Sequence, residues 1–373
     1  MDRFFPASHF FDRMKLIERA VYHELFMLQA LFHAWERHLV AATKDRVVRP
    51  FEWGLEWLPR NGPVVGAAPK TVLQTWVSDV MADTDAFFTP APTSDYSLDD
   101  DILTFPSALT TPHPSNNTVY CRFFPASSSQ SRRSAVVVLP QWNADPDGHA
   151  GLCKLLAWNG LSALRLSLPY HHERMPPELS RADFIVSANI ARTVQVCRQA
   201  VLDARRAIRW LERQGYERIG ILGTSLGSCL ALLTTAHEPL IQAEALNHIS
   251  PLFADVVWRG LSTAHVRQGL DGHIDLELLR DLWKPISPRW YLDRLRNRKT
   301  LLVYARYDLT FPVDLSKDLV REFRDGDVPH EVSVLTCGHY TTGKTPFKYV
   351  DGWALTRFLR RALLGATDTS GSR

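Results

Sequence analysis

The fold is decided by the stretch Ile219-Gly220-Ile221-Leu222-Gly223-Thr224-Ser225-Leu226-Gly227. The apolar run at its start predicts a strand, and the segment 228–236 after the G-x-S-x-G turn predicts a helix. A serine on so sharp a turn needs small neighbours two positions away on each side, because the strand and the helix nearly touch there. We therefore expect the Ser225 hydroxyl to stand at the carboxyl edge of a sheet, where N–H groups of the first helical turn face any nearby oxyanion.

The composition describes an ordinary globular chain built on one large domain. Of its 373 residues, 45% are hydrophobic and 22% are charged, and a formal charge of +3 does not favour a nucleic-acid partner. No signal-peptide pattern is present, and no apolar run reaches the roughly 18 residues of a spanning helix. Five widely spaced cysteines without a C-x-x-C pair argue against a disulfide framework or a zinc site. We therefore expect a soluble cytoplasmic protein.

Residues 1–98 are expected to form a helical and irregular extension. Apolar residues recur at three- and four-residue steps over residues 12–43, which predicts one long amphipathic helix. We expect this helix to pack on the main domain or on a second subunit, and contact with a membrane surface is the alternative. The part from residue 44 to residue 95 is rich in proline and glycine, includes one short predicted helix, Thr71–Met81, and indicates no function.

Residues 99–365 alternate between strands and helices, which predicts a mostly parallel sheet covered by helices on both faces and begun by an antiparallel pair. The segment 251–299 is too long for one crossover, and we expect it to form a helical cap over the carboxyl edge of the sheet. Residues 366–373 are expected to be a disordered tail. Besides the strand of the opening stretch, strands are predicted at 102–109, 118–124, 135–139, 161–168, 243–249, 300–305 and 332–336, and the other helices at 149–158, 184–214, 312–324 and 346–364.

Two more side chains follow later strands at the edge where Ser225 emerges. A serine hydroxyl becomes a nucleophile when a base takes its proton and a third group orients that base. In this order of elements the acid follows the serine and the histidine follows the acid. Asp308 ends the strand that begins at Leu301, and His339 follows the last strand. These two are the predicted partners, with Asp314 as the alternative acid and His330 as the alternative base.

An oxyanion needs two N–H donors, and the sequence indicates where they lie. One is Leu226, directly after the serine. The other is expected in the loop after the strand 135–139, at Trp142 or, as the alternative, at Gln141. His171 and His172 lack a third ligand at a recognisable spacing, so no metal site is predicted. The residues expected to contact the substrate are Gln141, Trp258 and His171. Asn247 and His248 end another strand and are expected to line the pocket.

With these residues the chain resembles the α/β-hydrolase superfamily, in particular cytoplasmic carboxylesterases and the dienelactone-hydrolase-like and acyl-peptidase-like branches. The resemblance covers roughly residues 100–365 and rests on Gly223-Thr224-Ser225-Leu226-Gly227, Asp308 and Gly338-His339. It implies a serine nucleophile, a cap between the sixth and seventh strands, and no cofactor. Pro140-Gln141-Trp142 stands where many members carry His-Gly-x, which disfavours the lipase branch with its HGGG motif.

The sequence therefore predicts a serine hydrolase that cleaves a carboxylic ester through an acyl-enzyme intermediate. Ser225 attacks, His339 shuttles the proton and Asp308 holds the imidazole tautomer. Acyltransferases, thioesterases and peptidases use the same triad and stay open as alternatives. A second hypothesis is a hydrolase-fold binding protein that docks through its N-terminal helix, although a binding module needs no intact triad. The expected partner is a small-molecule ester, with a second copy of the chain or a membrane surface at the N-terminal helix.

Overall fold

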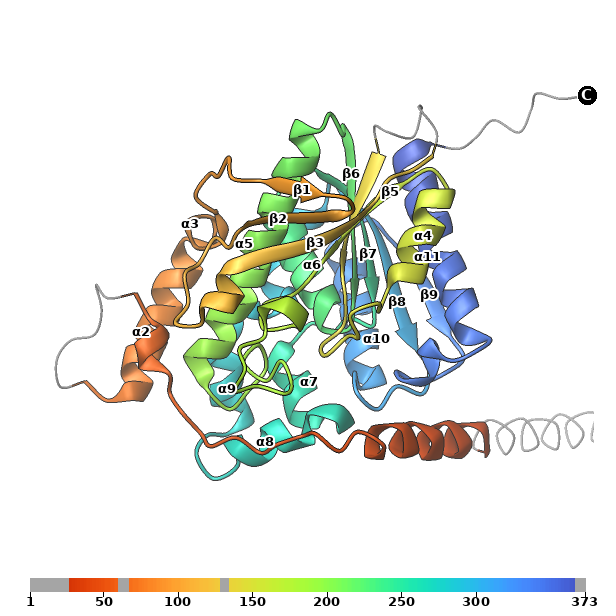
Figure 1. Ribbon diagram of the computed structural model, residues 1–373. Helices are drawn as coiled ribbons and strands as arrows, with labels where there is room; N and C mark the ends of the chain where they lie inside the picture. The colour runs from red at the N-terminus through yellow and green to blue at the C-terminus, as the bar shows by residue number, and fades with distance from the viewer. Residues whose placement is uncertain (1–26, 60–66, 128–133, 366–373) are drawn as a thin grey trace, which may run out of the picture.

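One mixed sheet organises the computed structural model, which describes residues 27–59, 67–127 and 134–365 (Figure 1). Nine strands of the described residues lie in the order β1-β2-β3-β5-β4-β6-β7-β8-β9. The strands from β5 to β9 run parallel, and β1, β2 and β3 add antiparallel pairs at one end. The strands are β1 (Ser97–Asp99), β2 (Ile102–Pro106), β3 (Thr118–Phe124), β4 (Ser134–Leu139), β5 (Ser162–Leu166), β6 (Arg218–Thr224), β7 (Ile241–Asn247), β8 (Lys299–Ala305) and β9 (His330–Leu335).

Helices cover both faces of this sheet, with α4 and α11 on one face and α5 and α6 on the other (Figure 1). The prediction of a mostly parallel sheet flanked by helices is thus confirmed. No helix of the described ranges combines the length and the apolar character needed to cross a bilayer. Besides a helical segment at 27–41, the helices are α2 (Pro69–Ala82), α3 (Thr84–Phe88), α4 (Ala150–Trp158), α5 (Ile190–Arg213), α6 (Leu226–His237), α7 (Phe253–Arg259), α8 (Ala264–Leu270), α9 (Leu276–Leu282), α10 (Val313–Asp325) and α11 (Phe347–Leu364).

Strand β4 shows why the centre of the sheet is apolar throughout. All six of its residues are buried. Val137 packs in the core on the side of α5 and α6, whereas Val136 and Val138 pack on the side of α4 and α11. Side chains alternate between the faces of a strand, so a strand covered on both faces needs an apolar residue at every position.

The parallel register brings the ends of five strands to one edge. Each strand pairs with its neighbour up to its last residues, so the loops that follow the strands leave the sheet side by side. Helices α7, α8 and α9 lie at this edge, and so does the segment 27–59 (Figure 1). The pairs that align the ends are Leu139 with Gly223, Thr224 with Asn247, Asn247 with Val303, and Ala305 with Leu335.

The turn between β6 and α6 is as tight as the sequence predicts. Ser225 has φ 57° and ψ −121°, a conformation that L-residues rarely adopt. A Cβ on Gly223 would lie 2.1 Å from the carbonyl oxygen of Gly227, and a Cβ on Gly227 would lie 2.2 Å from that of Leu139. The Ser225 N–H donates to the Asn247 carbonyl at 2.7 Å, which ties the turn to β7. The two glycines therefore let α6 rest directly on the strands.

The extension contacts the edge of the sheet through the helical segment 27–41. Phe32 stacks on Tyr307 with ring centroids 4.9 Å apart and meets Phe347 edge-on. This segment confirms the C-terminal part of the long helix predicted over residues 12–43, and residues 12–26 lie outside the described residues. Residues 366–373, predicted to be a disordered tail, also lie outside them.

The start of α5 differs from its prediction. We expected this helix to begin at Phe184, but it begins at Ile190, after Asn189, whose side chain accepts the Arg192 N–H as an N-cap. The loop before the cap is held by the extension, because the Glu52 N–H donates to Ala188 and the Glu52 carbonyl accepts from Ile190. Apolar spacing could not reveal this boundary, since the partner lies far away in the chain. The strand predicted at 102–109 likewise ends at Pro106, and β1 was missed.

The close approach at the turn makes a prediction about stability. Gly227→Ala should lower the free energy of unfolding by about 3 kcal/mol, because the new methyl group would collide with the Leu139 backbone. Gly151→Ala, on α4 with nothing within 4 Å, is the matched control and should be neutral or stabilising by up to about 1 kcal/mol. Urea unfolding followed by circular dichroism measures both. Equal effects of the two substitutions would contradict the close approach.

Candidate active site

The structure brings the three predicted residues together at the carboxyl edge of the sheet. Ser225 Oγ lies 3.0 Å from His339 Nε2, and His339 Nδ1 lies 2.8 Å from Asp308 Oδ2. Ser225 follows β6, Asp308 follows β8 and His339 follows β9. Because an ionised carboxylate only accepts, His339 donates from Nδ1, which leaves Nε2 free to take the serine proton. The arrangement can therefore generate a nucleophilic serine.

Contacts within the group decide its ionisation. Burial alone would lower the pKa of His339, but the charge of Asp308, its hydrogen bond and the charge of Glu36 raise this pKa above the ordinary 6.5. Burial alone would raise the pKa of Asp308, but His339 and His248 beside it hold this pKa well below its usual range. His339 is thus a stronger base than an ordinary histidine, and Asp308 stays ionised.

Asp308 is fixed from two sides. Its Oδ1 accepts the backbone N–H groups of Thr310 and Phe311, both at 2.7 Å, and its side chain is almost fully buried. The Phe311 ring stacks on the His339 imidazole, with centroids 5.3 Å apart and planes 7° from parallel. The orientation of the imidazole is thus held by a hydrogen bond along its edge and by a ring against its face.

The alternative residues lie elsewhere. Asp314 is exposed and pairs with Arg259 at 2.7 Å. His330 begins β9, at the opposite end of the strand from His339, and its Nδ1 donates to the Val328 carbonyl. Neither is joined to Ser225 by any hydrogen bond of the described residues.

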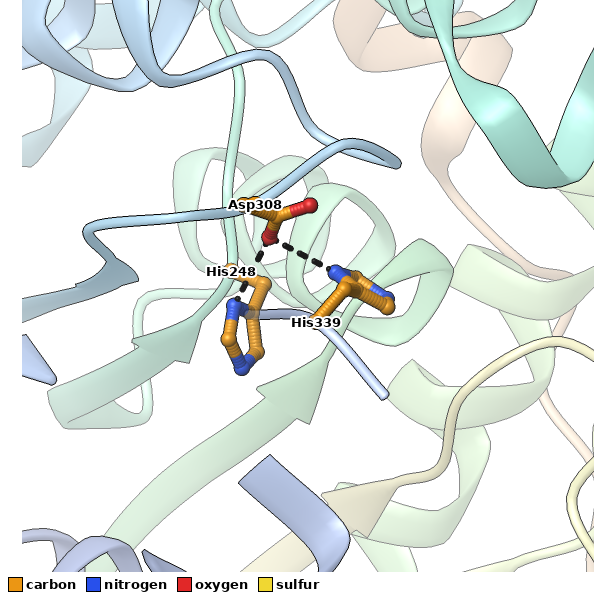
Figure 2. Close-up of side chains that lie close together, drawn as sticks. All are labelled: His248, Asp308 and His339. Atoms are coloured by element: carbon orange, nitrogen blue, oxygen red, sulfur yellow. Dashed lines mark hydrogen bonds and ion pairs between the residues drawn. The ribbon is translucent and has the colours of Figure 1, made fainter. Parts of the chain in front are cut away.

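A second histidine, His248, contacts the same carboxylate. Its Nδ1 lies 3.1 Å from Asp308 Oδ2, the oxygen that also accepts from His339 (Figure 2). The side chain is 2% exposed, and its Nε2 has no hydrogen-bond partner among the described residues. We considered His248 only for the lining of a pocket. Its position at the end of β7 places it on this edge, but no local pattern could reveal which carboxylate it reaches.

These three side chains also meet the geometric condition for holding a metal ion, since their ligand atoms lie within 4.8 Å of one another. A metal would need a lone pair on each of the imidazole nitrogens that it binds, whereas both Nδ1 atoms donate to Asp308 here. The hydrogen bonds therefore fit a carboxylate with two donors better than a metal centre.

The two expected oxyanion donors come from segments next to paired strands. Leu226 is the next residue, at the start of α6, and Trp142 lies in the loop after β4, the strand paired with β6. This loop is braced, because the Trp142 indole N–H donates to the Ala182 carbonyl at 2.8 Å and the Asn143 N–H donates to His171 Nε2 at 2.9 Å. The role of the two amides as donors stays a prediction.

The residues considered for substrate contact have different surroundings. Both ring nitrogens of His171 are engaged within the protein, Nε2 by Asn143 and Nδ1 by the Pro169 carbonyl, and burial lowers its pKa to about 3. This neutral ring braces the oxyanion loop and presents neither nitrogen to a substrate. Gln141 is half-buried in that loop. Trp258, at the end of α7, lies under the Arg267 guanidinium, and no hydrogen bond or ring contact of the described residues joins it to the triad.

The segment 251–299, which is the predicted cap, contacts the loop after β4. His265 of α8 stacks on Trp142, with planes 8° from parallel, and the Arg181 guanidinium lies 5.2 Å from the Trp142 ring. Ser225 is only 7% exposed. A cavity of about 620 Å³ opens beside Asp308, between the segment 27–41 and α10, but Ser225 and His339 do not line it. The nucleophile is therefore closely covered.

Solved structures of known proteins share this architecture, although no family model and no curated protein matches the chain by sequence. An acylaminoacyl peptidase of Pyrococcus horikoshii is 14% identical with a TM-score of 0.54, over 69% of this chain and 41% of the peptidase chain. This chain thus spans about two fifths of the peptidase. An acetyl xylan esterase from a Paenibacillus species is 15% identical with a TM-score of 0.57, over 82% of this chain and 100% of the esterase. Acetyl xylan esterase 1 from a Thermoanaerobacterium species is 12% identical with a TM-score of 0.52, over 81% and 99%.

The raised pKa of His339 predicts the pH dependence of serine reactivity. The imidazole must be neutral to take the proton, so the reaction of Ser225 with a fluorophosphonate should be lost as pH falls through a midpoint above 6.5. Labelling rates measured across the pH range give this midpoint, and heat-unfolded protein is the control. A midpoint at or below 6.5 would show that Asp308 and Glu36 do not act on His339 as described.

His248 should also influence reactivity. His248→Leu removes one of the two donors to Asp308 Oδ2 and should slow fluorophosphonate labelling on the order of tenfold. His248→Asn keeps an N–H donor and should recover part of the rate. His273, a histidine of the cap segment, provides the control His273→Asn. Labelling by His248→Leu at the rate of this control would refute the role of the second donor.

Proposed function

We propose that this chain, which has the fold of the α/β-hydrolase superfamily, is a serine hydrolase that cleaves carboxylic esters through an acyl-enzyme intermediate. The observation that carries the proposal is the continuous relay from Ser225 through His339 to Asp308, with links of 3.0 Å and 2.8 Å. A serine held at φ 57° on a tight turn supports it, because strained backbone is typical of functional sites.

In the first half of the proposed reaction the acyl-enzyme forms. Ser225 Oγ attacks the carbonyl carbon of the ester, and His339 Nε2 takes the hydroxyl proton as the new bond forms. The N–H groups of Leu226 and Trp142 receive the negative charge that develops on the carbonyl oxygen. The imidazolium then gives its proton to the alkoxide as the ester C–O bond breaks, which leaves the acyl group on Ser225.

The second half of the reaction releases the acid. Water attacks the acyl carbon while His339 takes its proton, the bond to Ser225 breaks, and the proton returns to Oγ. Asp308 stays ionised throughout and stabilises the imidazolium at each stage. Burial alone would raise the pKa of this carboxylate, but His339 and His248 beside it keep the pKa low enough for that task.

Esters are the preferred substrate class within this mechanism. The two acetyl xylan esterases match this chain over nearly their whole length, whereas the match to the acylaminoacyl peptidase covers about two fifths of that protein. Thioesters, amides and acyl transfer to another alcohol are the alternatives that use the same triad. No added cofactor takes part in any of these steps.

The cysteines and the exposed apolar side chains support the expected compartment and partners of the protein. All five cysteines are free and buried, which supports a reducing, cytoplasmic compartment. Met27, Leu28 and Leu31 on the segment 27–41 are exposed, which supports contact of this helix with a second copy of the chain or with a membrane surface.

The proposal is tested with a fluorophosphonate probe followed by peptide mass spectrometry. We expect one adduct, at Ser225, and its loss in Ser225→Ala, while the exposed Ser94→Ala labels like the wild type. Turnover of p-nitrophenyl acetate should fall by about 10³-fold or more in Ser225→Ala. A parallel acetyl-peptide substrate separates esterase from peptidase activity. Folded wild-type protein that neither labels nor turns over esters would refute the proposed function.

A further inference from the structure

A carboxylate from the N-terminal extension lies against the loop that carries His339. Glu36, on the segment 27–41, is fully buried. Its Oε2 accepts the Tyr340 N–H at 2.9 Å, and its Oε1 accepts the Thr341 N–H at 2.8 Å. Both donors come directly after His339 in the chain, so the two carboxylate oxygens grip the backbone that sets the position of the imidazole.

The loop is shaped around this carboxylate. A Cβ on Gly338 would lie 2.5 Å from the carboxyl carbon of Glu36, so any side chain at this position would push Glu36 away. The Gly338 N–H donates to Thr341 Oγ1 at 2.7 Å, which closes a tight turn around His339. Gly338 before the histidine leaves room for Glu36, and Tyr340 after it donates to Glu36.

The same helical segment also packs beside Asp308. Phe32 stacks on Tyr307, the neighbour of Asp308. Arg46, just beyond the helix, donates to the Val40 carbonyl at 2.7 Å and to the Tyr340 hydroxyl at 3.2 Å. These contacts hold Glu36 at a defined place relative to both His339 and Asp308.

The choice of a charged residue needs an explanation. Burying a carboxylate costs free energy unless hydrogen bonds or an opposite charge compensate, and Glu36 forms no ion pair with any described residue. Two backbone N–H groups satisfy its two oxygens, whereas a glutamine has one acceptor oxygen and would turn its NH₂ group toward the second donor. What the charge adds is a favourable interaction with protonated His339, whose pKa it helps to raise.

We propose that Glu36 is a positioning residue for His339: it fixes the loop through two backbone hydrogen bonds, and its charge stabilises the imidazolium that forms when Ser225 attacks. This inference rests on the proposed function, because the imidazolium forms during catalysis. The described part of the N-terminal extension then contributes to the active site by holding the loop that carries His339.

Glu36 is not the only charged group near His339. Asp308 provides the larger stabilisation of the protonated ring. Removing Glu36 should therefore shift the titration of His339 without abolishing it. The titratable and charged groups near the ring are Asp308 after β8, His248 after β7, Asp351 on α11, Cys337 and Tyr340 on its own loop, and Arg46 and Glu36 from the extension.

The test compares Glu36→Gln with Glu56→Gln, an exposed glutamate of the same extension. The first measurement is the pKa of His339, followed by NMR titration of the imidazole and assigned with His339→Gln. We expect a lower pKa in Glu36→Gln than in the wild type, and no change in Glu56→Gln. The second is fluorophosphonate labelling of Ser225, which should slow by on the order of 10- to 100-fold in Glu36→Gln, with its acid midpoint at lower pH.

A purely structural brace would change stability and leave the His339 titration in place. If folded Glu36→Gln shows the His339 pKa and the labelling rate of Glu56→Gln, the inference is overturned. Glu36→Asp guards against misfolding of the first variant: it keeps the charge but shortens the reach, so labelling should slow, and wild-type labelling by this variant would also overturn the inference. If the wild type does not label at all, the proposed function fails, whereas the NMR titration still decides whether Glu36 acts on His339.

Discussion

The contact between Gly227 and the carbonyl oxygen of Leu139 leaves no room for a side chain, and the rest of the site depends on it. It sets the start of α6 directly against the end of β4, so the turn with Ser225 and the loop with Trp142 become neighbours. The parallel register then places the residues after β8 and β9 at the same edge. Ser225, Asp308 and His339 come from widely separated parts of the chain and meet because the strands that precede them are aligned. The turn after β6 places the Ser225 hydroxyl beside His339.

Charge within the site is balanced around one carboxylate. Asp308 accepts hydrogen bonds from two histidines on one oxygen and from two backbone N–H groups on the other. Such a carboxylate neither moves nor takes up a proton easily, and the imidazole next to it keeps one tautomer. Glu36 adds a second negative charge from the far side of the His339 loop. The two carboxylates thus favour the protonated form of His339, which burial alone would disfavour.

Much of this architecture could be predicted from local pattern. Apolar runs identified the buried strands, and Gly223 and Gly227 identified the tight turn, because each depends only on neighbouring residues. The order of Ser225, Asp308 and His339 could be inferred because each directly follows a strand. The start of α5 could not, because its cap is stabilised by Glu52, and the roles of His248 and Glu36 could not, because their partners lie 60 and 304 residues away. Single-residue contacts of that range leave no periodic trace in a sequence.

The pairing of Glu36 with Tyr340 joins residues 304 positions apart and has a consequence for how the site assembles during synthesis. The glutamate is synthesised first, and its partner Tyr340 follows 304 residues later. At typical synthesis rates of about 5 to 20 residues per second, that delay is roughly 15 to 60 s. Ser225 is synthesised within this interval and before His339, so a chain that ends between the two holds the nucleophile without its base. The complete relay can therefore form only after His339 has been synthesised.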